Sequence, residues 1–351
     1  MKTINFIQDE ATPHNNILIK NINAINEIKL EYALSKSNQY EWDIDLTNEI
    51  INANIYGLKV NLRLIKNYIK KSKKESFLMV GWSNPTTRII FLLSVFFKLN
   101  LFMWFDLPDD NKKRSWLSRQ VRSLFHFLLK KSNIQLFCAG KTTIDYFSSK
   151  GFSKSRLHNL PIQVEVVKEK ILHFESNELK VFAGSRLTFD KGFDLLISAL
   201  GALPKNAKVK LRLAGTGPEK EQLEAQVKAL GLTTSVEFIG WLSPANYQQE
   251  LAKSDIFIHP ARVDAYGATV LALASGTPVI GSNGAGAVID CLIDGENGYV
   301  YRPEDVEKLS ELIMRFHDNQ FLITEFSKKA LLIANQYDGE YWAKQVIKAM
   351  K

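Results

Sequence analysis

Apolar residues recur along the chain with two spacings that alternate almost throughout. Apolar and polar positions alternate over 209–213, which predicts a strand with one buried face, and 255–259 is a second predicted strand that is closed by Pro260. Apolar residues at helical spacing occupy 218–230, and Gly231 predicts the end of that helix. This succession of strands and helices favours parallel sheets flanked by helices.

Strand-like segments also occur in the first half, with helical patterns between them. They are 4–7, 77–80, 101–105, 135–138 and 156–160. The last of them ends just before Pro161, where we place a domain boundary. We therefore predict an α/β protein with two Rossmann-like domains, 1–163 and 164–338, whose parallel sheets face each other across a cleft, and a final helix within 339–351.

The composition excludes several classes of protein. Hydrophobic residues make up 46% of the 351 residues, which is too many for a disordered chain. Cys138 and Cys291 lack metal-binding spacing and are too few for a disulfide framework, so we expect a reducing, cytoplasmic compartment. Residues 1–7 are too short an apolar segment for a secretory signal, and the apolar run 89–97 is closed by Lys98 before it could span a membrane.

Positive charge is concentrated in the first half. Residues 1–163 contain 24 Lys and Arg against 13 Asp and Glu, whereas 164–351 contain 21 against 24.

Part of this positive charge lies in 112–131, a basic amphipathic helical pattern that is typical of attachment to a membrane surface. Its shared apolar face consists of Leu117, Val121, Leu124 and Leu128. The alternative is a core-facing helix with a basic outer side. A nucleic-acid partner is not expected, because we find no nucleic-acid-binding motif.

Two cations lie where a predicted strand leads into a predicted helix. Arg186 and Lys191 follow the strand end 181–183 and the turn 184–185, and an apolar helical pattern begins at Phe193. The carboxyl ends of parallel strands bind ligands, and a helix start offers backbone N–H groups to anions. The pair therefore predicts a site for a diphosphate. The alternative is a solvated surface pair beside a turn.

Four stretches carry a resemblance to a known family. They are AGSRLTFDKGFDLLISAL at 183–200, LRLAGTGPEKEQLEAQVKALGL at 211–232, VEFIGWLSPANYQQELAKSDIFIHPARVDAYG at 236–267 and SGTPVIGSNGAGAVIDCLIDGENGYVYRPEDVEKLSELI at 275–313. In these stretches the chain resembles the retaining GT-B glycosyltransferases of glycosyltransferase family 4, also called glycosyl transferases group 1. The resemblance is dense over 179–318 and fainter over the first half.

The resemblance implies transfer of a hexosyl group from a UDP- or GDP-linked nucleotide sugar, with retained anomeric configuration and without a metal ion or other cofactor. It implies that 164–338 binds the donor and that 1–163 binds a glycan or lipid-linked acceptor. The final helix, 339–351, is expected to pack back on the first domain. The enzyme is expected to act in bacterial surface polysaccharide synthesis, in the cytoplasm or at the inner face of the cell membrane.

The resemblance also assigns roles to individual residues. Arg186 and Lys191 match the cations that stabilise the diphosphate leaving group, and Asp264 matches an acid that binds hydroxyl groups of the donor sugar. Cations placed at the leaving group act more strongly on the transition state than on the substrate. An alternative role for Asp264 is to cap the next helix. The other donor-binding candidates are Gly184, Gly215, Gly217, Tyr266, Gly267, Ala268, Thr269, Gly286 and Asp290.

The chain departs from the family pattern in its donor half. The family's second glutamate, which lies near the nucleotide ribose, is missing, as if one residue had been deleted before Ala272. His259 ends a strand before Pro260, and we assign it to packing.

Candidates for acceptor contacts lie in the first half. The loop after the first strand lacks the family's paired glycines, but its polar residues make Asp9, His14 and Asn15 acceptor-binding candidates. Asp106 follows the strand 101–105 and is a further catalytic candidate that would touch the sugar.

Two other functions stay open. One is a GT-B nucleotide-sugar epimerase, which the order of the motifs disfavours. The other is a non-catalytic GT-B module that binds a glycan or a partner transferase, and the missing glutamate is the feature that favours it.

Overall fold

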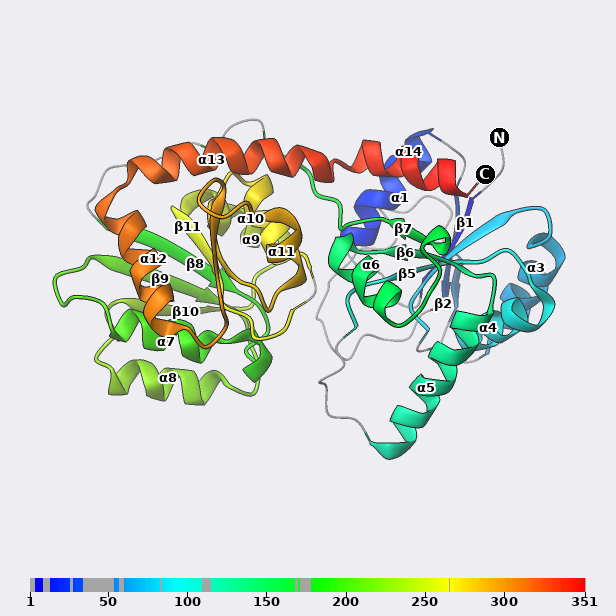
Figure 1. The fold of residues 1–351 in the computed structure, drawn as a ribbon, viewed down its shortest axis with the longest axis horizontal. Helices are drawn as coiled ribbons and strands as arrows, with labels where there is room; N and C mark the ends of the chain where they lie inside the picture. Colours follow the sequence, from blue (N-terminus) through cyan, green and yellow to red (C-terminus); the bar gives the residue numbers. More distant parts are fainter. Residues whose placement is uncertain are drawn as a thin grey trace. The chain divides into compact units, whose positions relative to one another are not determined.

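The chain divides into two compact units in the computed structural model, which describes residues 4–8, 13–25, 28–33, 54–56, 60–82, 84–108, 115–167, 170, 178–264 and 266–350. Unit 1 comprises Met1–Gln163 and Gly339–Lys351, and unit 2 comprises Val164–Asp338 (Figure 1). The ribbons of both units show a parallel sheet with helices packed against it, as the alternation of strand and helix patterns predicts.

Within the described residues, unit 1 contains a sheet of seven strands in the order β3-β2-β1-β4-β5-β6-β7. The strands are β1 (Ile4–Gln8), β2 (Ile28–Ala33), β3 (Asn54–Tyr56), β4 (Ser76–Val80), β5 (Phe102–Phe105), β6 (Gln135–Cys138) and β7 (Leu157–Asn159). Every neighbouring pair is parallel. The chain runs outward from β1 on one side and then crosses to β4 on the other, which is the Rossmann order.

The helices of unit 1 form a layer on each face of this sheet. They are α1 (Pro13–Ile25), α3 (Leu62–Lys71), α4 (Pro85–Phe97), α5 (Trp116–Lys131), α6 (Gly140–Ser149) and α14 (Gly339–Ala349), with a short 3-10 turn at Lys154–Arg156. One apolar core includes residues of α1, α14 and one face of the strands. A second core includes residues of α3, α4, α5 and α6 with the alternate strand residues. The helix α14 therefore belongs to unit 1 although unit 2 precedes it in the chain.

Unit 2 repeats the same strand order. Its described residues form a six-stranded parallel sheet, β10-β9-β8-β11-β12-β13. The strands are β8 (Leu179–Gly184), β9 (Val209–Ala214), β10 (Val236–Gly240), β11 (Ile256–His259), β12 (Val279–Ser282) and β13 (Gly298–Tyr301). The order reverses between β8 and β11, so these two strands flank the switch point at which open α/β sheets bind ligands.

The helices of unit 2 cover both faces of its sheet. They are α7 (Phe193–Gly201), α8 (Lys220–Ala229), α9 (Pro244–Lys253), α10 (Ala268–Ala274), α11 (Gly286–Cys291), α12 (Val306–Asp318) and α13 (Phe321–Ala334), with 3-10 turns η2 (Phe189–Lys191) and η3 (Asn335–Tyr337). Residues of α7, α8, α12 and α13 share one core with the sheet. On the other face, the Tyr247 ring of α9 meets the Phe182 ring of β8 at a centroid distance of 5.0 Å.

Local signals in the sequence fix several helix ends. Ser243 caps α9, because its side-chain oxygen accepts a hydrogen bond from the Asn246 N–H at 3.3 Å, and Pro244 takes the first helical position. Gly231 follows α8 with a φ of +69°, as expected of a glycine that ends a helix. The helix α8 begins at Lys220, two residues after Pro218, because the intervening residues form a turn.

One prediction about unit 1 is corrected. The loop predicted after the first strand does not extend to His14 and Asn15, because α1 begins at Pro13. The predicted apolar face of the basic helix is mostly exposed, which disfavours the core-facing alternative. Leu117, Val121 and Leu124 are 65%, 45% and 59% exposed, whereas Leu128 packs partly against the core that contains Phe125 and Leu129 of α5. The segment 109–114 before this helix lies outside the described residues.

Candidate functional site

Most of the predicted donor residues lie at the carboxyl edge of the unit 2 sheet, beside its switch point. The segment that follows β8 carries Arg186 and Lys191, and the segment that follows β11 carries Asp264. Because β8 and β11 are neighbouring parallel strands, their carboxyl ends bring these two segments together.

Lys191 and Asp264 form an ion pair. The Lys191 Nζ lies 2.9 Å from Oδ1 of Asp264 and 3.2 Å from Oδ2 of Asp190, and the side chains of Lys191 and Asp264 are 11% and 16% exposed. Burial by itself would lower the pKa of the lysine, but the charges and hydrogen bonds of Asp264 and Asp190 together outweigh it and raise that pKa above its ordinary value. The ammonium is therefore held in its charged form beside the strand ends.

His259 completes this group, and the sequence had suggested packing for it. The ring Nε2 lies 2.9 Å from Oδ2 of Asp264, and Nδ1 lies 2.8 Å from the Thr269 hydroxyl oxygen. Burial would raise the pKa of the Asp264 carboxyl, but the His259 hydrogen bond and the Lys191 charge hold it well below its usual range. The sequence signal was available, since a polar residue ended an otherwise apolar strand.

Arg262 fixes the backbone of the loop that carries Lys191. Its guanidinium donates to both carboxylate oxygens of Asp194 at 2.7 Å, and to the Phe189 carbonyl at 2.9 Å. The guanidinium also lies 4.0 Å from the Phe189 ring centroid. The Arg262 backbone N–H donates to the Asp190 carbonyl at 2.9 Å. These contacts of Arg262 cannot be predicted from local sequence patterns, because their partners lie about 70 residues away along the chain.

The glycines of the site permit close backbone contacts. Gly215 has a φ of +133°, and a Cβ there would lie 1.8 Å from the Ser185 carbonyl oxygen. A Cβ on Gly217 would lie 2.3 Å from the Leu187 carbonyl oxygen. These two glycines therefore form a tight turn that packs against the segment that carries Arg186, rather than a glycine-rich loop that surrounds a phosphate. Gly184, at the end of β8, accepts a hydrogen bond from the Tyr247 hydroxyl at 2.8 Å through its carbonyl.

Arg186 is exposed, and it lies between Ser185 and the buried Leu187. Leu187 is held by a backbone hydrogen bond to the Thr216 carbonyl at 2.8 Å. The structure thus anchors the backbone on the carboxyl side of Arg186 and leaves its side chain accessible to solvent at the strand end.

A second group of candidates surrounds Tyr266. Its hydroxyl donates to Oδ2 of Asp290 at 3.2 Å and lies 3.7 Å from the Cys291 sulfur, and the residue is 9% exposed. Burial raises the pKa of the Tyr266 phenol above its ordinary range. Gly286 begins α11, and its N–H donates to the Asp264 carbonyl at 3.1 Å. The structure therefore connects the Asp264 loop to the start of α11.

The helix after Asp264 begins as predicted, but Asp264 does not cap it. Gly267, with a φ of +105°, is the cap residue of α10, Ala268 is the first helical residue, and the described cap has no side-chain hydrogen bond. The Asp264 side chain is bound by Lys191 and His259 instead. Thr269 is buried and contacts His259.

The missing glutamate leaves α10 without a carboxylate. Its sequence is ATVLALA, and Ala272 has no exposed surface. The described part of α10 therefore offers no acidic side chain for a ribose.

Candidates in unit 1 occupy different local environments. Asp106 is exposed and follows β5 directly. Asn15 is 6% exposed and donates through Nδ2 to Oε1 of Gln8 at 2.8 Å, so the first turn of α1 is bound to the end of β1. His14 lies in the same turn, and Asp9 lies outside the described residues. Burial of Asn15 favours a structural role over direct contact with an acceptor.

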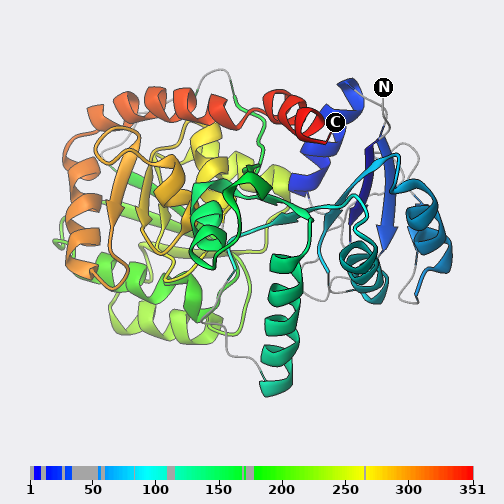
Figure 2. The ribbon, with the colours of Figure 1, turned by 45° about the vertical axis from the view of Figure 1, so that its right-hand side comes forward.

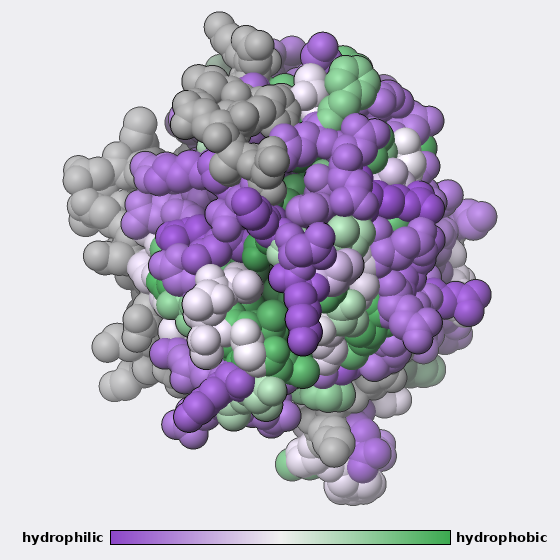
Figure 3. All heavy atoms as spheres, turned by 90° about the vertical axis from the view of Figure 1, so that its left-hand side faces the viewer, coloured by the Kyte–Doolittle hydropathy of each residue, from purple (hydrophilic) through white to green (hydrophobic). Residues whose placement is uncertain are grey.

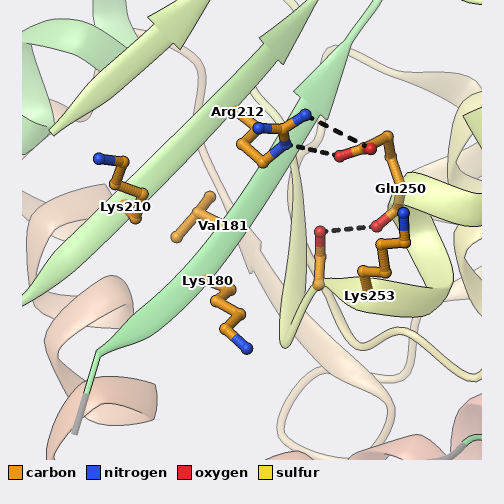
Figure 4. A pocket seen from close by; sticks show the side chains of 7 residues that line it. Lys180, Val181, Lys210, Arg212, Glu250 and Lys253 are labelled. Carbon is orange, nitrogen blue, oxygen red and sulfur yellow. Dashed lines mark hydrogen bonds and ion pairs between the residues drawn. The ribbon is translucent and has the colours of Figure 1, made fainter. Parts of the chain in front are cut away.

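A surface cavity of about 440 Å³ lies at the opposite end of the unit 2 sheet. It is lined by Lys180, Val181, Lys210, Arg212, Glu250, Lys253 and Ser254. Figure 4 shows that Arg212 is directed at Glu250, to which it donates at 2.7 Å, while Lys180 and Lys210 point away from each other. The cavity adjoins the first residues of β8 and β9, so it does not belong to the switch-point site.

No group of three or more His, Cys, Asp or Glu side chains among the residues that the structure describes could hold a metal ion. No helix formed by them is long and apolar enough to cross a bilayer.

Comparison with known sequences supports a transferase relationship. Residues 165–333 match the family Glycosyl transferases group 1. An alpha-monoglucosyldiacylglycerol synthase of Streptococcus pneumoniae is 31% identical over 134 residues, which cover 37% of this chain and 30% of that protein. An exopolysaccharide phosphotransferase of Streptomyces coelicolor is 30% identical over 164 residues, which cover 46% of this chain and 17% of that protein. The match thus spans less than a third of these two relatives.

Solved structures resemble the whole chain. The Anabaena protein HepE in complex with UDP superposes with a TM-score of 0.77 at 17% identity, over 99% of each chain. The apo form of the lipopolysaccharide outer core galactosyltransferase WaaB gives a TM-score of 0.75 at 15% identity, over 99% of this chain and 98% of that one. At such identities the likeness concerns the fold. The chain therefore has the GT-B fold of two Rossmann-like domains, and residues 165–333 of it match the Glycosyl transferases group 1 family.

Proposed function

We propose that this protein transfers a sugar from a nucleotide-sugar donor, with the donor bound at the switch point of unit 2. The observation that carries the proposal is the ion pair of Lys191 with Asp264, supported by His259, at the carboxyl edge of a Glycosyl transferases group 1 domain. A buried lysine held charged beside the strand ends is suited to a diphosphate leaving group.

The geometry accounts for how Lys191 could serve both the pair and the donor. An ammonium has three N–H donors, and the contacts with Asp190 and Asp264 use two of them. The third is available to a phosphate oxygen without loss of the pair. As the bond between sugar and diphosphate breaks, negative charge grows on the bridging oxygen, and a cation already in place stabilises it.

Arg186 would supply the second positive charge. Its guanidinium offers a planar fork to phosphate oxygens, whereas Lys191 acts as a point charge. The exposure of Arg186 at the end of β8 suits a group that meets a ligand from solvent. Asp264 would accept hydrogen bonds from hydroxyl groups of the sugar, and its lowered pKa keeps it an acceptor near neutral pH.

The nature of the donor and the course of the reaction are also proposals. The fold neighbour HepE was solved with UDP and with UDP-glucose, which favours a uridine nucleotide and a hexosyl group here. We further propose retention of anomeric configuration and catalysis without a metal ion, on the resemblance of the Arg186–Lys191 and Asp264–Gly267 segments to retaining enzymes.

The acceptor is proposed to be a glycan or a lipid-linked acceptor bound by unit 1, in bacterial surface polysaccharide synthesis in the cytoplasm or at the inner face of the cell membrane. Relatives of this chain include an alpha-monoglucosyldiacylglycerol synthase and a poly(glycerol-phosphate) alpha-glucosyltransferase, whose names give a glycosylated lipid as product and a polymer as acceptor. Asp106 remains the candidate in unit 1 for contact with the transferred sugar, because it is exposed after β5.

The absent acidic residue in α10 favours one other candidate, a non-catalytic module that binds a glycan or a partner transferase. Titration calorimetry with UDP-glucose and other nucleotide sugars, followed by assays of donor hydrolysis and transfer, separates the two. The proposed enzyme binds a donor and turns it over, and Lys191→Ala reduces kcat by about 10²–10³-fold. A chain that binds no nucleotide sugar, or a Lys191→Ala variant with the wild-type rate, would contradict the proposal.

A further inference from the structure

Three helices of unit 1 lie side by side on one face of its sheet. The helix α4 packs between α3 and α5, and their inward residues share one core with the strands. The ribbons in Figures 1 and 2 place these helices away from α1 and α14, which cover the other face. We call the outward side of these three helices the α3–α5 surface.

The α3–α5 surface exposes large apolar side chains. They are Leu62 and Ile69 of α3, Leu92, Phe96 and Phe97 of α4, and Trp116, Leu117, Val121, Leu124 and Phe127 of α5. Phe96 and Trp116 are 69% and 68% exposed. Figure 3 shows another face of the molecule for contrast, where hydrophilic side chains predominate and hydrophobic ones appear in limited areas between them. Such a gathering of exposed apolar residues marks a contact surface rather than ordinary water-facing structure.

The exposed apolar residues of α4 lie on the side of the helix that faces away from the core. Leu92 and Phe96 are four residues apart and share one side of the helix, while Ile90 and Ser94 are buried on the other side. A surface helix normally carries polar residues on its outward side. The outward side of α4 instead carries Leu92, Phe96 and one cation, Arg88.

The charge of these helices has a single sign. They contain no Asp or Glu and nine Lys and Arg, of which four lie in α3, one in α4 and four in α5. In α3 these cations are Arg63, Lys66, Lys70 and Lys71, and in α5 they are Arg119, Arg122, Lys130 and Lys131. The helices α8 and α12 of unit 2 differ, because they carry both signs and form internal ion pairs such as Lys220–Glu224 and Lys308–Glu311.

We infer that the α3–α5 surface docks unit 1 on an anionic lipid bilayer. Apolar side chains enter the boundary between head groups and acyl chains, while lysines and arginines beside them pair with anionic head groups. The combination favours a bilayer over a nucleic acid. A phosphate backbone attracts the cations, but its binding does not remove exposed leucine and phenylalanine side chains from water. The inference extends the expectation for the 112–131 helix to a surface built from three helices.

This inference deepens the proposed transfer to a lipid-linked acceptor. The biological purpose of the docking rests on that proposed function, but the docking itself does not. Docking through unit 1 would bring the acceptor-binding unit to the plane where a lipid-linked acceptor lies. The binding itself is measurable without donor or acceptor, so it can fail while donor binding succeeds, and the reverse also holds.

The charge contribution is tested by sedimentation of the full chain with vesicles. We expect binding to phosphatidylcholine vesicles that contain phosphatidylglycerol, and much weaker binding to phosphatidylcholine alone or at high salt. The double variant Lys66→Gln, Arg119→Gln should lower the partition coefficient by about 10–30-fold, since each cation near a surface is worth about fivefold. The control variant Lys205→Gln, Lys228→Gln removes the same charge from exposed positions of unit 2 and should leave binding unchanged.

The apolar contribution is tested in the same assay. The double variant Phe96→Ser, Trp116→Ser should weaken binding at least tenfold, because both side chains would leave water in the bound state. Its matched control is Phe321→Ser, Leu332→Ser, which alters two equally exposed apolar residues of α13 in unit 2. Calorimetry with UDP-glucose in the absence of vesicles should give wild-type affinity for all four variants, which also shows that they are folded.

Three results would overturn the inference. Wild-type protein that does not sediment with anionic vesicles excludes a bilayer as the partner of this surface. Control variants that lose as much binding as the α3–α5 variants place the contact elsewhere. The surface is purely electrostatic if the protein binds tightly to duplex nucleic acid that carries as much negative charge as the vesicles, and if the Phe96→Ser, Trp116→Ser variant binds that nucleic acid as tightly as wild type. If no nucleotide sugar binds while vesicles do, the proposed function is wrong and the docking surface stands.

Discussion

The Lys191–Asp264 pair makes a prediction that can be tested before any substrate is known. We consider the substitutions Lys191→Met and Asp264→Asn, separately and together. Met keeps most of the apolar stem of lysine and Asn keeps the shape of the carboxylate, so the variants remove charge with little change of volume. Each single change leaves the other charge poorly exposed and without its partner 2.9 Å away.

The expected cost follows from what each partner retains. Breaking a fully buried ion pair from one side costs about 3–5 kcal/mol. Here Asp264 keeps its contact with His259 and Lys191 keeps its contact with Asp190, so we expect about 2 kcal/mol for each single variant. The double variant removes both charges, so neither is left without its partner, and it should also lose about 2 kcal/mol. The two single losses then exceed the double loss by a coupling energy of about 2 kcal/mol.

Thermal and urea denaturation of the four proteins give the required free energies. For a domain of the size of unit 2, each single variant should lower the midpoint temperature by about 4–8 °C. The same cycle on the exposed pair of Lys329 with Glu325 serves as a control and should show far less coupling. If the losses of the two single variants add within about 0.5 kcal/mol in the double variant, the two side chains do not depend on each other and the site as described is wrong.

Three further predictions concern residues around this pair. Gly215→Ala should destabilise the protein by more than about 2 kcal/mol and weaken donor binding in calorimetry, whereas Gly231→Ala, with positive φ but open space around it, should cost about 1 kcal/mol; equal losses would contradict the close contact at Gly215. The lowered pKa of Asp264 adds stability above the unfolded carboxyl pKa of about 4, and this is lost as pH falls below it, so wild-type protein should lose more thermal stability between about pH 6 and pH 3 than Asp264→Asn; parallel pH profiles would refute the shift. Arg262→Lys keeps the charge but loses the two-pronged bond to Asp194, and we expect a loss of about 1–2 kcal/mol in denaturation experiments; a variant as stable as wild type would show that the fork is dispensable.

The sequence by itself determined the elements and their class. Local signals are sufficient for this, because a residue such as Ser243 caps α9 and Gly231 ends α8 through contacts with neighbours a few residues away. The same signals placed Arg186 and Lys191 at the strand-to-helix turn after β8, where the structure has them.

Only the tertiary structure decided what those residues contact. The assignment of His259 to packing overlooked Asp264 and Thr269, which become its partners when the chain turns back after β11. Periodicity groups Leu117, Val121 and Leu124 on one face of a helix, but it cannot say whether that face meets a core or water. That choice depends on which side of α5 the sheet of unit 1 occupies, and such long-range packing is not encoded in the spacing of residues along one helix.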